Sequence, residues 1–139
     1  MEWIYHINDI GQVASAFWAS QAGKKLFAFH GEMGAGKTSF IHALCDARGV
    51  KEAVGSPSFS LVNEYETADQ LQTIYHMDLY RIRDEEEAFR AGIEDCLYSG
   101  HICLVEWPEK IPGLIPTETV HVFIEWVDNE RRRIKIADN

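Results

Sequence analysis

The sequence predicts a three-layer α/β fold in which helices cover both faces of a mixed β-sheet. Two nearly continuous apolar runs, within 24–30 and 102–106, are typical of parallel strands that are buried on both faces. Two pairs of strand-like segments, within 59–78 and 119–137, are separated by short polar turns and indicate antiparallel hairpins. We therefore expect a sheet with a parallel core to which antiparallel hairpins are added.

Hydrophobic periodicity and capping residues indicate where the helices lie. Gly23 and Gly49 follow two helical patterns and are suited to end them. Asp84 is suited to cap a third helix, because acidic residues fill the turn that follows it. In chain order, we expect a strand over 2–6, a helix over 10–21, a strand over 24–30, a helix over 38–48, a hairpin over 59–67 and 71–78, helices over 84–90 and 93–98, a strand over 102–106, and a hairpin over 119–127 and 131–137.

Length and composition are those of one ordinary globular domain over residues 1–139. Hydrophobic residues make up 46% and charged residues 25%, which excludes disordered and low-complexity classes. No apolar stretch reaches the roughly 20 residues that cross a bilayer, and the first residues do not resemble a signal peptide. The three cysteines have no Cys-x-x-Cys spacing, so neither a disulfide framework nor a zinc knuckle is indicated. We therefore expect a cytoplasmic protein with no membrane association.

The net charge of −9 restricts the possible partners. Because the phosphate backbone of a nucleic acid repels an acidic surface, this chain is not expected to bind nucleic acid alone. Any contact with a nucleic acid is expected to run through a partner protein.

The strongest functional signal is the octapeptide Gly-Glu-Met-Gly-Ala-Gly-Lys-Thr over 31–38, which satisfies the pattern G-x-x-x-x-G-K-[ST]. Its glycines let backbone N–H groups converge on a polyphosphate, while Lys37 reaches the β- and γ-phosphates and Thr38 ligates Mg²⁺. The helix that begins near Thr38 directs its positive end at the same anion. A predicted strand precedes this motif and a predicted helix follows it, so the sequence predicts a P-loop NTPase fold that binds ATP and Mg²⁺.

A P-loop needs a second acidic residue near the metal, commonly at the end of a neighbouring buried strand. Glu106 closes the apolar run 102–105 and has this position. Asp78, at the end of another predicted strand, is the competing candidate. His76 is expected to be an ordinary polar residue, because no second histidine stands at metal-ligand spacing.

Three further segments have roles that the sequence leaves open. Ser58 precedes the first hairpin and is suited to sense the γ-phosphate, although 56–59 alone would be a simple turn. A lone tryptophan is most often a core residue, and we expect this of Trp107. Arg131–Arg133 is expected to protect a sheet edge by its charge, with contact to the nucleotide or to a partner as the alternative.

Missing motifs narrow the chemistry further. The guanine-reading pattern Asn-Lys-x-Asp does not occur, and no Asp-x-x-Gly follows the P-loop. The sequence also lacks the long arginine-bearing lid that nucleoside kinases use. These absences favour an ATPase, with a small P-loop metabolite kinase and a nucleotide-gated binding module of negligible turnover as the alternatives.

Four motifs, taken in order, resemble the TsaE family, which is also called YjeE. They are the P-loop over 31–38, Ser-Pro-Ser-Phe over 56–59, His-Met-Asp-Leu-Tyr-Arg over 76–81 and Val-Glu-Trp-Pro-Glu over 105–109. The resemblance extends over about 26–109. The family usually has Thr at the place of Ser58, and commonly has Asp-Leu at 32–33. Ser58 keeps the hydroxyl group of the usual Thr. Residues 32–33 contribute mainly backbone to the P-loop, so their side chains matter less.

The resemblance implies a role in the bacterial biosynthesis of threonylcarbamoyladenosine in tRNA. Family members work with the TsaD and TsaB proteins, whose complex transfers the threonylcarbamoyl group, and their ATP cycle sustains turnover of that complex. The resemblance also implies that tRNA is contacted only indirectly, through the complex. We therefore expect a Mg²⁺-dependent ATPase that is slow alone and stimulated by its partners.

The motifs and the resemblance together assign roles to individual residues. Lys37, Asp78 and Glu106 are the expected catalytic residues, with Asp78 orienting the water or a metal-bound ligand. Thr38 and Glu106 are expected to bind the metal. The residues expected to bind the nucleotide are Gly31, Met33, Gly34, Ala35, Gly36, Lys37, Thr38, Ser39 and Ser58.

Overall fold

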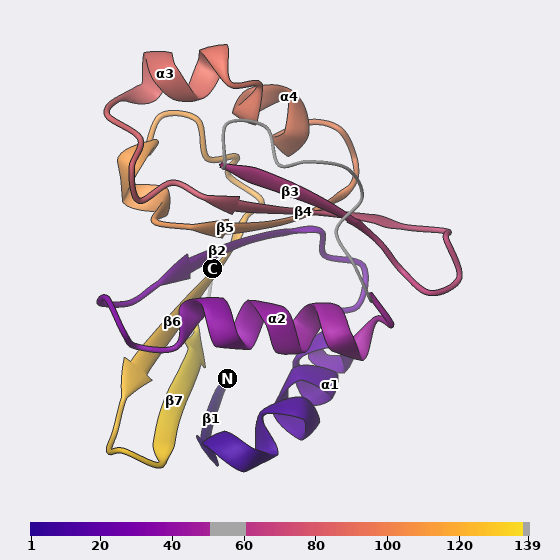
Figure 1. Cartoon of the computed structure of the whole chain (residues 1–139), viewed down its shortest axis with the longest axis vertical. Helices are drawn as coiled ribbons and strands as arrows, with labels where there is room; N and C mark the ends of the chain where they lie inside the picture. Colours follow the sequence, from indigo (N-terminus) through magenta and orange to yellow (C-terminus); the bar gives the residue numbers. More distant parts are fainter. Residues whose placement is uncertain (51–60, 138–139) are drawn as a thin grey trace.

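The computed structural model describes residues 1–50 and 61–137, which form a seven-stranded sheet between two layers of helices (Figure 1). The strands are β1 (Glu2–His6), β2 (Leu26–His30), β3 (Val62–Glu66), β4 (Thr73–Asp78), β5 (Ile102–Glu106), β6 (Val120–Trp126) and β7 (Arg131–Ile136). The helices are α1 (Ile10–Ser20), α2 (Lys37–Ala47), α3 (Glu85–Arg90) and α4 (Ile93–Leu97), with 3-10 turns at Ile7–Asp9 and Pro108–Lys110. The predicted α/β class is confirmed.

The sheet has the order β1-β7-β6-β2-β5-β4-β3. Strands β6, β2, β5 and β4 pair in parallel and form its centre. The antiparallel pairs β3–β4 and β6–β7, together with β1 on β7, complete the two edges. Because parallel strands end at the same edge of a sheet, the last residues of the four central strands gather there. These residues are His30, Asp78, Glu106 and Trp126.

Helices α1 and α2 cover one face of the sheet and enclose an aromatic core. Phe17 of α1 lies at its centre, with its ring centroid 5.4 Å from that of Phe27 on β2 and 5.5 Å from that of Phe40 on α2. The indole of Trp18 donates a hydrogen bond of 2.9 Å to the carbonyl of Leu44, which ties α1 to α2. This packing fixes α2, the helix that follows the P-loop.

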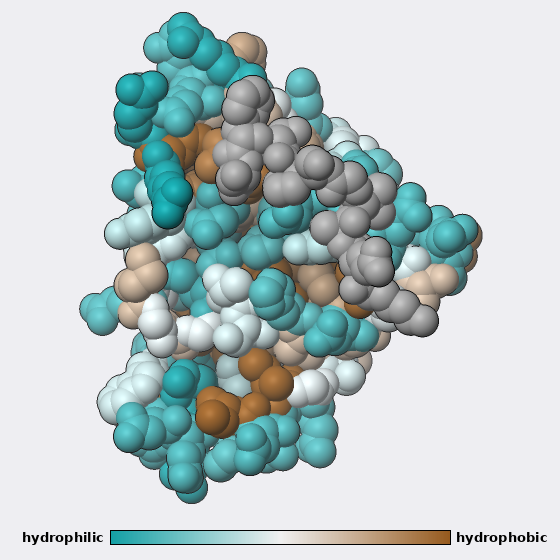
Figure 2. Space-filling model, viewed as in Figure 1, coloured by the Kyte–Doolittle hydropathy of each residue, from teal (hydrophilic) through white to brown (hydrophobic). Residues whose placement is uncertain are grey.

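Helices α3 and α4 cover the opposite face through a second apolar cluster. Asp84 caps α3 by accepting a hydrogen bond of 2.8 Å from the backbone N–H of Glu87, as its position predicted. Ile93 and Leu97 of α4 are buried against the sheet. On the face seen in Figure 2 the surface is mainly hydrophilic, because the large apolar side chains lie in these two layers.

The observed elements differ from the predicted ones mainly at their ends. Helix α2 begins at Lys37, one residue earlier than predicted, and β4 begins at Thr73 because 71–72 belong to the turn. The predicted strand over 59–67 falls partly outside the described residues and is seen as β3 from Val62. Pro108 opens a 3-10 turn between β5 and β6. No described helix has the length and apolar character needed to cross a membrane.

Replacing Phe17 with Ala should lower the free energy of unfolding by about 3–5 kcal/mol, because it empties the centre of the larger core. Phe89→Ala is the matched control, because Phe89 is 61% exposed on α3 and its removal should cost less than about 0.5 kcal/mol. Denaturant unfolding of both variants gives the comparison. Equal losses would mean that the aromatic cluster is not the main stabilising element.

Candidate functional site

The P-loop connects β2 to α2 through backbone conformations that require glycine. Gly34 and Gly36 have φ angles of +83° and +106°, in the left-handed region that other residues rarely adopt. Gly31 is required for space instead, since a Cβ there would lie 2.6 Å from the carbonyl oxygen of Ile124 on β6. The loop is therefore seated against the neighbouring strand, with the first turn of α2 opening directly after it.

Lys37 is buried at the start of α2 and is held on two sides. Its ammonium group donates a hydrogen bond to the carbonyl of Gly31 and lies 3.5 Å from the centroid of the Trp107 ring, a cation–π contact. Burial lowers the pKa of Lys37 below its usual value, although the carboxylates of Glu106, Glu109 and Asp78 act in the opposite direction. The lysine thus points back over the P-loop.

Glu106 is the buried acid at the centre of the site. It is 2% exposed and accepts hydrogen bonds from the Thr38 hydroxyl, at 2.8 Å, and from Nε2 of His76, at 2.6 Å. Burial acts to raise the pKa of the Glu106 carboxyl, but the hydrogen bonds from His76 and Thr38 and the charge of Lys37 outweigh it, so the pKa lies below its usual value. The carboxylate is therefore held ionised beside the P-loop.

His76 contacts the acid of the site, although the sequence indicated only an ordinary polar residue. The side chain is 5% exposed on β4, and its ring links that strand to Glu106 on β5. Among the described residues, its other ring nitrogen, Nδ1, has no hydrogen-bond partner. It is thus a polar residue satisfied on one side by the acid of the site.

Asp78 ends β4 directly opposite Glu106, its register partner on β5. Its carboxylate is exposed and accepts a hydrogen bond of 3.1 Å from the backbone N–H of Tyr80. Of the two candidate acids, Glu106 is therefore the one in contact with Thr38, and Asp78 stands further out in the same cavity.

The oxygens of Thr38 and Glu106 fit the requirements of Mg²⁺. Their separation of 2.8 Å is close to the roughly 2.9 Å between adjacent oxygens in an octahedron with bonds of about 2.05 Å. The described residues hold no group of three or more His, Cys, Asp or Glu that could enclose a metal ion. Mg²⁺ commonly keeps waters and binds one or two protein oxygens together with phosphates.

A cavity of about 300 Å³ lies along the P-loop. Gly31 and Ala35 border a neighbouring cavity, and Ser58 lies outside the described residues. The predicted site residues that line the P-loop cavity are Met33, Gly34, Gly36, Lys37, Thr38, Ser39, Asp78 and Glu106.

Three lining residues were not predicted for this site: Tyr80, Trp107 and Arg132. Trp107 was expected in the core; it is half-buried and packs against the smaller apolar cluster, and its ring also contacts the Lys37 ammonium. Its backbone has a left-handed φ of 60°. Arg132 was expected at a sheet edge, yet its side chain approaches Gly36 across the sheet. Trp107 directly follows Glu106 and Tyr80 stands two residues after Asp78, and this closeness in sequence was the available signal.

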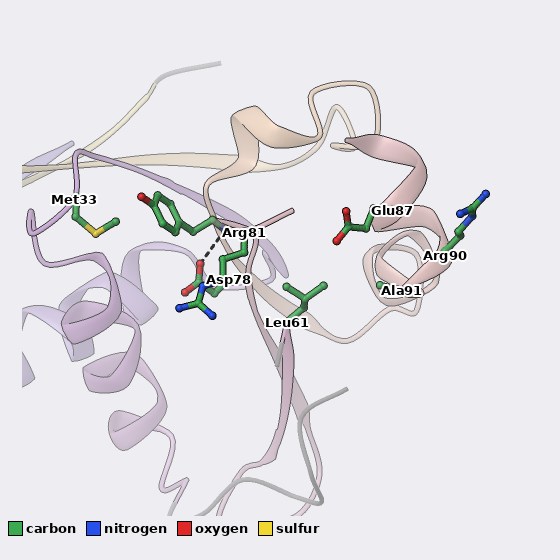
Figure 3. Close-up of a pocket in the computed structure, with 8 residues that line it drawn as sticks. Met33, Leu61, Asp78, Arg81, Glu87, Arg90 and Ala91 are labelled. Carbon is green, nitrogen blue, oxygen red and sulfur yellow. Dashed lines mark hydrogen bonds between the residues drawn. The ribbon is translucent and has the colours of Figure 1, made fainter. Parts of the chain in front are cut away.

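A second cavity, of about 730 Å³, adjoins the first at Asp78 and Tyr80. Figure 3 shows Met33 of the P-loop at one end and Glu87 and Arg90 of α3 at the other, with Asp78 and Arg81 nearer the P-loop. Acidic and basic groups therefore alternate along this cavity.

Comparison with known proteins identifies the family. The sequence profile of the family described as Threonylcarbamoyl adenosine biosynthesis protein TsaE matches residues 4–134. Proteins named tRNA threonylcarbamoyladenosine biosynthesis protein TsaE, from Haemophilus influenzae and Treponema pallidum, are 40% and 31% identical to it. These alignments cover 78% and 88% of this chain, and 67% and 93% of the relatives. The crystal structure of YdiB from Bacillus subtilis matches with a TM-score of 0.69 and 26% identity, over 100% of this chain and 86% of the other. This chain therefore belongs to the TsaE family.

Proposed function

We propose that this protein is a Mg²⁺-dependent ATPase that serves the biosynthesis of threonylcarbamoyladenosine in tRNA together with TsaD and TsaB. Membership of the TsaE family supports the pathway. The observation that carries the ATPase activity is the contact of the Thr38 hydroxyl with the buried Glu106 carboxylate, 2.8 Å apart, at the start of the helix that follows the P-loop. A P-loop hydroxyl and a strand-end acid in contact form the metal-binding half of an NTPase site.

Different residues of the site bind the phosphates, bind the metal and position the acid. Backbone N–H groups of Gly34, Ala35 and Gly36 hold the phosphates, and Lys37 neutralises the β- and γ-phosphates. Thr38 and Glu106 would hold Mg²⁺, which when bound would neutralise charge on the transferred group. His76 positions the Glu106 carboxylate, since its hydrogen bond occupies the second oxygen.

Lys37 has hydrogen-bond donors left for this role. Its ammonium has three N–H donors, and the structure shows one hydrogen bond from it, to the Gly31 carbonyl, beside the contact with the Trp107 ring. Phosphate oxygens are strong acceptors for the other donors because they are charged. Asp78, at the open side of the site, is suited to orient the attacking water.

Among the described residues, neither arginine of the segment after β4, Arg81 or Arg83, is fixed over the P-loop by a hydrogen bond or ion pair. Arg83 is held by Glu87 through a hydrogen bond of 2.8 Å and is exposed on the α3 side. Arg81 lines the larger cavity beside Asp78, and no described hydrogen bond or ion pair holds it. This arrangement supports slow hydrolysis by the chain alone, with the remaining charge supplied when a partner docks. The net charge of −9 supports contact with tRNA only through that complex.

A small metabolite kinase is the second candidate, because the cavity of about 730 Å³ beside Asp78 could hold a phosphate acceptor. The fate of the γ-phosphate distinguishes the two activities. An ATPase releases free phosphate into water, whereas a kinase transfers the group to a hydroxylated small molecule. A nucleotide-gated binding module would do neither at a measurable rate.

Lys37→Ala should weaken ATP binding by about 10- to 150-fold, the equivalent of losing one charge-assisted contact of roughly 1.5–3 kcal/mol. Lys24→Ala is the control, because Lys24 is exposed at the other end of β2. Calorimetric titration with ATP and Mg²⁺ measures both. Wild-type affinity and turnover in a folded Lys37 variant would contradict the P-loop assignment.

Glu106→Gln should keep the fold but lose most of the Mg²⁺ dependence of ATP binding and hydrolysis, since an amide of the same shape cannot neutralise the cation. Asp78→Asn should retain that dependence and lose turnover. Titration of each variant with Mg²⁺ at fixed ATP gives the two results. The reverse pattern would exchange the roles of the two acids.

Phosphate release by the isolated chain should be slow and should accelerate with purified TsaD and TsaB present. An arginine supplied at the right moment accelerates phosphoryl transfer by about 10³–10⁵-fold, which sets the upper range of the effect. Steady-state phosphate release, alone and with both partners, is the measurement. Rapid hydrolysis that the partners leave unchanged would indicate a different ATPase on the same loop.

A further inference from the structure

The sheet order determines which way a nucleotide extends from the P-loop. Strand β2 leads into the loop and lies between β5 and β6. The β5 side carries the metal-binding chemistry, with Glu106 at the end of β5 and Asp78 at the end of β4. In the proposed complex the γ-phosphate lies on that side, so the α-phosphate, ribose and base extend toward β6.

Trp126 ends β6 at this same edge of the sheet. Residues two apart on a strand share a face, so Trp126 lies on the face of Val122 and Ile124, which pack in the larger core beneath α1 and α2. Unlike them, Trp126 is 55% exposed. It borders a cavity of about 700 Å³ whose other wall is the P-loop, including Gly31 and Gly34.

Arg132 stands opposite Trp126 on β7, as its register partner. Its guanidinium donates hydrogen bonds of 2.7 Å and 2.9 Å to the carbonyls of Asp128 and Arg131, which fix its direction. Its Nε lies 3.6 Å from where a Cβ on Gly36 would be, and it lines the P-loop cavity. An arginine and an exposed indole are thus brought side by side next to the phosphate-binding backbone.

We propose that Trp126 and Arg132 bind the nucleoside end of the nucleotide, with the indole stacked on the base and the guanidinium on the α-phosphate and ribose. This inference rests on the proposed ATP binding at the P-loop. The two cavities share Met33 and Gly34, so a ligand can extend from one into the other. Stacking on an aromatic ring suits any base, and a guanidinium suits phosphate oxygens.

The test compares ATP with inorganic tripolyphosphate, each with Mg²⁺, by calorimetric titration. The wild type should bind ATP more tightly, because tripolyphosphate has no base. Trp126→Ala should weaken ATP binding by about 5- to 150-fold and leave tripolyphosphate binding unchanged, while Trp126→Phe retains most of the ATP affinity. Arg132→Ala should weaken both ligands, because it removes a phosphate contact.

The matched control is Tyr98→Ala, an exposed aromatic residue near the opposite end of β2 that should alter neither affinity. ATP binding by Trp126→Ala at wild-type affinity would overturn the inference and leave ATP binding at the P-loop intact. The inference would also be overturned if Trp126→Ala lost stimulation by TsaD and TsaB while its ATP affinity stayed unchanged. That result would make Trp126 a contact with the partner proteins. Failure of the wild type to bind either ligand would instead overturn the proposed function as well.

Discussion

The buried carboxylate of Glu106 is the interaction on which the site depends. A charge that is 2% exposed is tolerated only where hydrogen bonds compensate for its lost hydration, and here Thr38 and His76 supply them. These partners come from α2 and β4, so one side chain on β5 connects three elements. The same contacts keep the acid ionised, and this links the packing of the sheet to the ability of the site to hold a cation.

The electrostatics of the cavity explain why a metal ion belongs to the proposed activity. The buried ammonium of Lys37 is close enough to Glu106, Glu109 and Asp78 for the charge of each carboxylate to act on its pKa. A triphosphate entering such a cavity would meet repulsion from these groups as well as attraction from the lysine. A Mg²⁺ ion held by Thr38 and Glu106, as proposed, would offset that repulsion, and carboxylate and hydroxyl oxygens are ligands that this ion accepts.

Local patterns in the sequence predicted most of the fold. The runs 26–30 and 102–106 and the periodicity of 38–48 are set by burial, which a single sequence reveals. The P-loop is equally local, because its function requires its glycines and its lysine to be adjacent. Glu106 and Asp78 could be nominated as strand ends, but their order of contact with Thr38 depends on which strand lies beside β2, and pairing between distant strands is not a local property.

Trp107 and Arg132 are two site residues whose contacts could not be predicted from local sequence patterns. The left-handed backbone at Trp107 is unusual for a residue with a side chain, and propensity favoured an ordinary core position. Arg132 reaches Gly36, 96 positions away in the chain, only because β7 folds back on β6 and β6 pairs with β2.

The C-terminal hairpin therefore acts on both the sheet and the site. Through Val122 and Ile124 it completes the larger core, and through the carbonyl of Ile124 it supports the P-loop at Gly31. Trp126, the last residue of β6, and Arg132, its register partner on β7, lie beyond Ile124 at the edge of the sheet where the P-loop begins. Strand β2 is thus flanked on one side by β5, which carries the acid proposed to hold the metal, and on the other by β6, which carries the indole proposed to bind the base. Both proposed sets of nucleotide contacts therefore come from one edge of the sheet, while the larger cavity at Asp78 and Arg81 extends away from the P-loop toward α3.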